Sequence, residues 1–79
     1  MFKNKNEDGS LNLCGKKVAE LRKSERLSQR AFADKLQLAG MDLNKNAIQQ
    51  IESGQRFITD IELKAIAKFF DIAVDVLVN

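Results

Sequence analysis

The feature that most limits the possible folds is a series of short segments whose apolar residues lie three and four positions apart. Residues 63–70 repeat at this spacing, which places four apolar side chains on one face of a helix. Thr59 and Glu62 form a T-x-x-E capping box just before them, and such a box marks a helix start. Only residues 74–78 (VDVLV) alternate as a strand would, and a single strand has no partner within the chain.

The same signals divide the rest of the chain into helices. Ser28 is a favourable N-cap residue, and Gly40 and Gly54 supply the left-handed positions at which helices commonly end. The predicted fold is all-α, a compact bundle of about five short helices. They span residues 15–26, 29–38, 45–53, the Thr59 cap to about 70, and a short helix or turn over 73–78.

Composition limits the classes of protein that remain. A chain of 79 residues with 44% hydrophobic residues can build one small domain, which we expect over residues 13–79 after a flexible arm at 1–12. Cys14 is the only cysteine and there is no histidine, so a disulfide framework and a Cys/His metal cluster are both excluded within one chain. No apolar run reaches the roughly 18 residues of a membrane span. We therefore expect a cytoplasmic protein that needs no metal or other cofactor and does not enter a membrane.

The charges are distributed unevenly. Residues 1–57 hold 11 basic and 7 acidic side chains, whereas residues 58–79 hold 2 and 4. This asymmetry would let one end face a polyanion while the other faces a protein, although ordinary surface variation gives the same pattern. Lys3 and Lys5 in the arm could contact a phosphate backbone, or the arm could be a solvated tail, as chain ends usually are.

The predicted helix over residues 45–53 has two sharply different faces. On a helical wheel its apolar residues occupy one side, and its polar residues cover a contiguous arc of about 140° on the other. A helix with this division can enter the major groove of DNA, where Asn and Gln bond to adenine and Lys bonds to guanine. A solvated helix face gives the same pattern. The polar arc consists of Lys45, Gln49, Ser53, Asn46 and Gln50, with Glu52 at its border.

One charged residue lies on an apolar stripe. In the predicted helix 15–26, Arg22 falls between Val18 and Leu21 on the side that also carries Cys14. A buried guanidinium without a carboxylate partner costs several kcal/mol, so we expect a downstream acid to pair with it. Cys14 itself lies on the apolar stripe, and without histidine the usual nucleophile and base pairs are absent. We do not expect an enzyme.

The strings ELRKSERLSQRAFADKL, NAIQQIESGQR and ELKAIAKFFDI resemble the helix-turn-helix domains of the Cro and phage-repressor type, the XRE family. The resemblance covers residues 15–77 and implies a lambda-repressor-like helix-turn-helix fold that binds double-stranded DNA. One departure is the segment 38–44, which is several residues longer than the family's tight turn.

The resemblance also implies roles for individual residues. It pairs Arg22 with Glu52 in a structural ion pair, and it places Gln29 against a phosphate at the start of the second helix. The competing interpretation is that Gln29 is only a polar residue of the first turn. The base-reading candidates are Asn44, Lys45, Asn46, Gln49 and Gln50, of which Asn46 and Gln50 rank first. The phosphate-binding candidates are Gln29, Arg30, Ser53, Arg56, Lys16 and Lys17.

We therefore expect a small transcriptional repressor that occupies a palindromic operator. These 79 residues leave no room for a sensor domain, and one reading helix recognises only a few base pairs, so a homodimer is expected. The main alternative is a protein-interaction module, such as an antitoxin that binds a small toxin partner. Candidates for self-association, each of which could equally pack within the monomer, are Phe57, Ile58, Phe69, Val76 and Val78.

Overall fold

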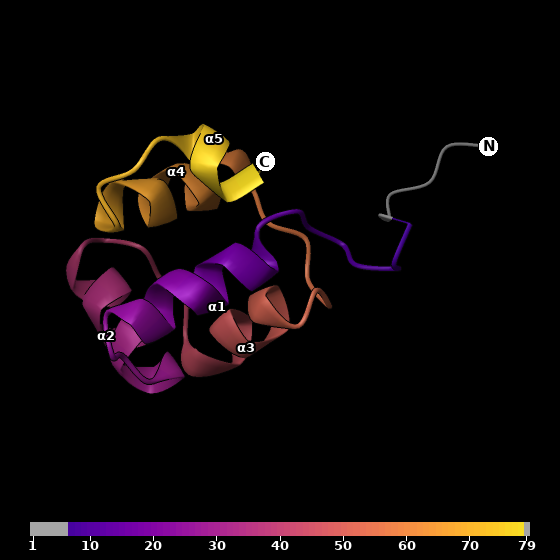
Figure 1. Ribbon diagram of the computed structural model, residues 1–79. Coiled ribbons are helices and arrows are strands. Elements are labelled where there is room, and N and C mark those ends of the chain that lie inside the picture. The colour runs from indigo at the N-terminus through magenta and orange to yellow at the C-terminus, as the bar shows by residue number, and fades with distance from the viewer. Residues whose placement is uncertain (1–6, 79) are drawn as a thin grey trace.

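The computed structural model describes residues 7–78, which form five helices joined by turns, with no strand in this range (Figure 1). This confirms the predicted all-α class, and residues 74–78 are helical rather than extended. The helices are α1 (Gly15–Ser24), α2 (Gln29–Leu38), α3 (Lys45–Glu52), α4 (Asp60–Phe69) and α5 (Val74–Val78).

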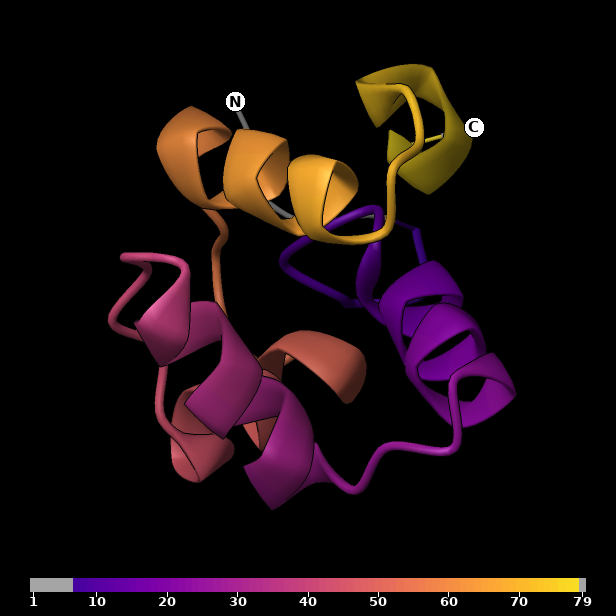
Figure 2. The same ribbon diagram turned by 90° about the vertical axis from the view of Figure 1, so that its left-hand side faces the viewer.

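The helices form two groups. α4 and α5 pack together on one side of α1, α2 and α3, and the chain enters from the end of the bundle where α1 begins (Figure 1). Seen from the side, α4 lies above α2, and α1 lies lower and to the right (Figure 2). α3 packs against α1 and α2, so its remaining face points away from the bundle.

The core is aliphatic around one aromatic cluster. Phe32 of α2 is fully buried, and its ring centroid lies 5.2 Å from that of Phe69 and 5.3 Å from that of Phe70. These contacts join α2 to the end of α4, and burial of such a side chain contributes about 1.5–3 kcal/mol. The other buried apolar residues are Cys14, Val18, Ala33, Leu36, Leu43, Ile48, Ile51, Ile66, Ala67 and Leu77.

The side-chain caps at the helix starts follow the sequence signals. Ser28 Oγ accepts from the Ala31 amide at 3.0 Å at the start of α2. At α4 the predicted capping box is confirmed, because Thr59 Oγ1 accepts from the Glu62 amide and the Glu62 carboxylate accepts from the Thr59 amide. These bonds satisfy amide groups that have no partner within the helix.

The end of α1 differs from the sequence prediction. The helix stops at Ser24 rather than continuing to residue 26, and Arg26 adopts a left-handed conformation with φ 58°. The Leu27 amide then donates to the Arg22 carbonyl at 3.1 Å, a bond that closes a Schellman motif. Glu25, the C-cap residue of α1, is exposed.

A long connection separates α2 from α3. Gly40 follows the end of α2 with φ 93°, as predicted, and residues 41–44 lead from there to α3. Leu43 is only 2% exposed and fixes this connection to the core. The extra residues therefore form an anchored loop, and α2 and α3 still pack directly against each other.

The segment before α1 runs along the end of α3. The Leu11 amide donates to the Gly54 carbonyl at 2.8 Å, and the Asn12 side chain is hydrogen-bonded to several backbone groups of the domain. Lys3 and Lys5 lie outside the described residues. The flexibility of an arm over residues 1–12 stays a prediction, but Leu11 and Asn12 are bonded to the domain.

Candidate nucleic-acid interface

α3 has the two faces that its sequence predicts. Ile48 and Ile51 are fully buried, and Ala47 packs partly against the same core. The polar residues on the opposite side are exposed to solvent, because no other element covers that side of the helix. These exposed residues are Lys45, Asn46, Gln49 and Gln50.

The exposed face of α3 carries amide and ammonium groups, whose donors and acceptors match the edges of DNA bases. Each Asn or Gln amide offers a donor and an acceptor in one plane, which matches the N6 and N7 positions of adenine, while a Lys ammonium donates to guanine. Asn44 differs from its neighbours because its side-chain oxygen accepts from the Ala47 amide at 2.8 Å and caps α3. Its NH₂ group is then the part that can reach a base.

Glu52 lies where α1, α2 and α3 meet. Arg22 Nε donates to Glu52 Oε2 at 2.7 Å, and Arg22 Nη2 donates to Glu52 Oε1 at 3.0 Å. The Arg22 and Glu52 side chains are only 10% and 8% exposed, and Arg22 Nη1 also bonds to the Leu27 carbonyl. The structure thus brings together the two residues that the resemblance pairs, and the pair ties α3 to α1.

Gln29 joins the same carboxylate. Its Nε2 donates to Glu52 Oε1 at 3.0 Å from the first turn of α2. One hydrogen of the amide NH₂ points to Glu52, and the group has a second hydrogen that can donate to an anion. Gln29 therefore stands beside α3 at a helix start, a position suited to the proposed phosphate contact.

Arg56 forms an ion pair with Glu62 of α4. Its Nη1 and Nη2 donate to the two carboxylate oxygens of Glu62 at 2.9 and 3.0 Å, and Nη1 also bonds to the Phe57 carbonyl. The hydrogen bonds from Arg56 hold the pKa of Glu62 below its ordinary value, and the same bonds raise the pKa of Arg56. Contact with a phosphate would require Arg56 to share or leave this ion pair.

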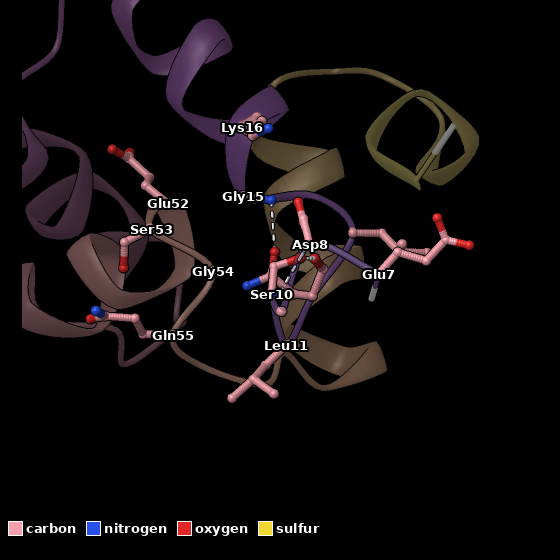
Figure 3. Close-up of a pocket in the computed structure, with 13 residues that line it drawn as sticks. Glu7, Asp8, Ser10, Leu11, Gly15, Lys16, Glu52, Ser53, Gly54 and Gln55 are labelled. Carbon is pink, nitrogen blue, oxygen red and sulfur yellow. Dashed lines mark hydrogen bonds between the residues drawn. The ribbon is translucent and has the colours of Figure 1, made fainter. Parts of the chain in front are cut away.

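The remaining phosphate-binding candidates differ in their exposure and in the contacts that they already make. Lys16 is exposed on the first turn of α1 and lines an open pocket of about 1040 Å³ together with Glu52 and Ser53 (Figure 3). Lys17 pairs with Glu20 on its own helix at 3.5 Å. Arg30 is exposed next to Gln29, and Ser53 Oγ donates to the Gln50 carbonyl at 3.2 Å.

Asn12 was missed by the sequence analysis, which placed it in the arm. It is only 9% exposed and bonds to the end of α3. The one local signal was the residue type, because Asn often accepts from a backbone amide close to it in the sequence, and its oxygen does accept from the Gly15 amide at 2.8 Å, although the N-cap of α1 is Cys14.

Comparison with protein families identifies the family of this chain. A family model described as helix-turn-helix matches residues 18–77, most of the chain. The chain belongs to the XRE-type helix-turn-helix family. This XRE-type domain therefore has the all-α lambda-repressor-like fold, built from helices α1 to α5. No curated protein and no solved structure matches the chain.

Membership suggests a DNA-binding transcription regulator, from a family whose members are generally not enzymes. Among residues 7–78 of this XRE-type domain, no group of three or more His, Cys, Asp or Glu side chains is arranged to hold a metal ion. None of the described helices is both long enough and apolar enough to cross a membrane.

Proposed function

We propose that this chain is a sequence-specific transcriptional repressor that binds a palindromic operator as a homodimer. The observation that carries the proposal is the exposed amide and ammonium face of α3, on a helix whose isoleucines on the other side are fully buried. Asn46 and Gln50 are its principal base readers, with Asn44, Lys45 and Gln49 beside them. A rigidly held helix is required because a bidentate base contact depends on the direction of the side chain.

Phosphate contacts from the flanking elements support the same orientation. Gln29 and Arg30 on the first turn of α2, and Lys16 on that of α1, supply backbone contacts that fix register without reading sequence. Lys17 and Ser53 are weaker candidates because each already makes a contact within its own helix or helix end. Arg56 is the weakest, since Glu62 neutralises it.

Selection of oligonucleotides from a random pool tests the proposal directly. The wild-type protein should enrich one palindromic site whose half-sites lie about 34 Å apart. The double variant Asn46→Ala, Gln50→Ala should lose that preference, by roughly 1–3 kcal/mol for each contact removed. Gln37→Ala is the matched control, because Gln37 is an exposed amide on α2. A folded double variant that enriches the same site as the wild type would refute the assignment of these readers.

A salt titration separates DNA binding from the protein-interaction alternative. If phosphates are neutralised, the logarithm of the affinity falls with the logarithm of salt concentration, with a slope of about −0.9 per phosphate contacted. Absence of DNA binding at low salt, together with co-purification of a small protein, would favour the antitoxin interpretation.

The dimer rests on apolar residues that the monomer leaves exposed. Phe57 is 55% exposed and Val76 is 43% exposed, so these two candidates have side-chain area free for a second copy. Phe69 instead packs against Phe32 and Phe70, and Ile58 and Val78 are partly covered by the core. Sedimentation of the wild type and of Val76→Asp tests this, because a charge in an apolar interface should shift the protein towards the monomer. A wild-type protein that stays monomeric at high concentration would contradict the proposed homodimer.

A further inference from the structure

Asn12 connects the start of α1 to two positions near the end of α3, which lie 39 and 44 residues away in the sequence. Its side-chain Nδ2 donates to the Ile51 carbonyl at 3.1 Å and to the Arg56 carbonyl at 2.8 Å. Its Oδ1 accepts from the Gly15 amide at 2.8 Å, the bond drawn at Gly15 in Figure 3. One side chain therefore holds the start of α1, the last turn of α3 and the connection that leads to α4.

The contact occurs where two helices approach closely. A Cβ atom added to Gly15 would lie 2.2 Å from the Ile51 carbonyl oxygen, so only a glycine lets α1 come this near to α3. Ser10 packs against Gly54 on the same side, and the Leu11 amide bonds to the Gly54 carbonyl. Figure 3 shows Ser10, Gly15 and Gly54 close together at the end of α3.

We propose that Asn12 is a positioning residue for the recognition helix, and that it acts by fixing the C-terminal end of α3 relative to α1. This inference rests on the proposed function, because its effect on DNA requires that α3 reads bases. Asn12 itself contacts no base in this scheme. It sets the direction of the helix that carries Asn46 and Gln50.

The physical argument is that α3 has only eight residues and thus little contact area to define its tilt. The Glu52 carboxylate holds the side of α3 that faces α1 and α2, while Asn12 bonds to the main chain at Ile51. These restraints act on different atoms. If the Asn12 amide is removed, the Ile51 and Arg56 carbonyls lose a common donor, and the last turn of α3 can move with respect to α1.

The test uses Asn12→Ser, which keeps a side-chain oxygen that can accept from the Gly15 amide but removes the NH₂ donor. Leu13→Ala is the matched control, because Leu13 is the neighbouring residue and is 64% exposed. Both variants are compared with the wild type at a temperature where circular dichroism shows each one fully folded. The readouts are affinity for the oligonucleotide that the wild type selects, affinity for a scrambled duplex, and the amide chemical shifts of α3.

For Asn12→Ser we expect about a tenfold loss of affinity for the selected oligonucleotide, the effect of losing roughly one well-placed base contact. Binding to the scrambled duplex should change by less than about twofold, because phosphate contacts tolerate small shifts. A role limited to stability would leave both affinities of the folded protein unchanged. That result, or equal losses on both duplexes, would overturn the inference.

The amide shifts keep the inference testable apart from the proposed function. If the wild type selects no sequence, the proposed function fails, but Asn12→Ser should still move the amide shifts of residues 50–55 while Leu13→Ala leaves them in place. If Asn12→Ser does not fold, Asn12→Asp replaces it, since a carboxylate can also accept from the Gly15 amide and also lacks the NH₂ donor. Unmoved shifts in a folded Asn12 variant would refute the inference whatever DNA does.

Discussion

Replacement of Glu52 by glutamine removes the charge at the meeting point of α1, α2 and α3 with almost no change in shape. In the wild type Arg22 donates two hydrogen bonds to Glu52, and the side chains of this ion pair are about nine-tenths buried. In Glu52→Gln a neutral amide faces the guanidinium with one acceptor oxygen. Arg22 keeps its bond to the Leu27 carbonyl but lacks a counter-charge.

Loss of one partner from a buried ion pair costs about 3–5 kcal/mol, because the remaining charge stays desolvated. The bond to Leu27 and the retained amide oxygen place the expected loss at the lower end, about 3 kcal/mol. A domain of this size has a total stability of about 4–12 kcal/mol, so the loss is a large fraction of it. At about 4–8 °C per kcal/mol, the melting temperature should fall by about 12–24 °C.

Thermal and urea denaturation followed by circular dichroism at pH 7 measures this loss. The control is Glu20→Gln, because Glu20 pairs with Lys17 in an exposed contact and should contribute at most about 1 kcal/mol. The double variant Arg22→Met, Glu52→Leu should be more stable than Glu52→Gln, since it leaves no buried charge. A melting temperature of Glu52→Gln that matches that of Glu20→Gln would refute the reasoning.

Three further predictions follow from other contacts. Because the pKa of Glu62 is lowered in the folded state, its ion pair stabilises the protein above the unfolded-state pKa of about 4.3 and this contribution is lost as pH falls through the folded pKa. Glu62→Gln should therefore lose less stability than the wild type in urea titrations between about pH 5 and pH 3, and parallel pH profiles would contradict this. Arg26→Gly should stabilise the folded protein by about 0.5 kcal/mol, because relief of the left-handed strain exceeds the entropy that glycine gains on unfolding. The control Glu25→Gly, at φ −87°, should destabilise the protein, and a destabilised Arg26→Gly would contradict the prediction. Cys14 is 1% exposed and burial raises the pKa of its thiol, so a thiol reagent should modify it only after denaturant is added, and rapid labelling of the native protein would show that α1 opens.

Elements with local signals could be predicted from the sequence. The starts of α2 and α4 follow from Ser28 and the Thr59 capping box, and the end of α3 follows from Gly54, because each signal acts on residues within one turn of itself. The two faces of α3 were also predictable, since they depend only on the spacing of its isoleucines. The end of α1 was not, because Arg26 adopts a left-handed conformation that its residue type disfavours.

Long-range contacts set the limit for the candidate site. The partners of Asn12 lie 39 and 44 residues away, so no pattern within the arm indicates that its side chain is buried. Leu43 looks like a loop residue in the sequence and is a core residue in the structure. From the sequence, Arg56 after Gly54 looks like a free cation. In the structure the carboxylate of Glu62, in the capping box of α4, accepts hydrogen bonds from both of its terminal nitrogens. The Arg22–Glu52 contact was expected only through resemblance to a family, since 30 residues separate the two.

The separation between the residues that hold α3 and the residues that it exposes has a consequence for sequence change. Ile48, Ile51 and Glu52 bear the contacts that keep the helix in place, whereas Asn46 and Gln50 face solvent. Substitutions at exposed helix positions usually change stability by less than about 0.5 kcal/mol. The outward positions can thus diversify independently of the fold, and a library randomised at these positions should yield mostly folded proteins.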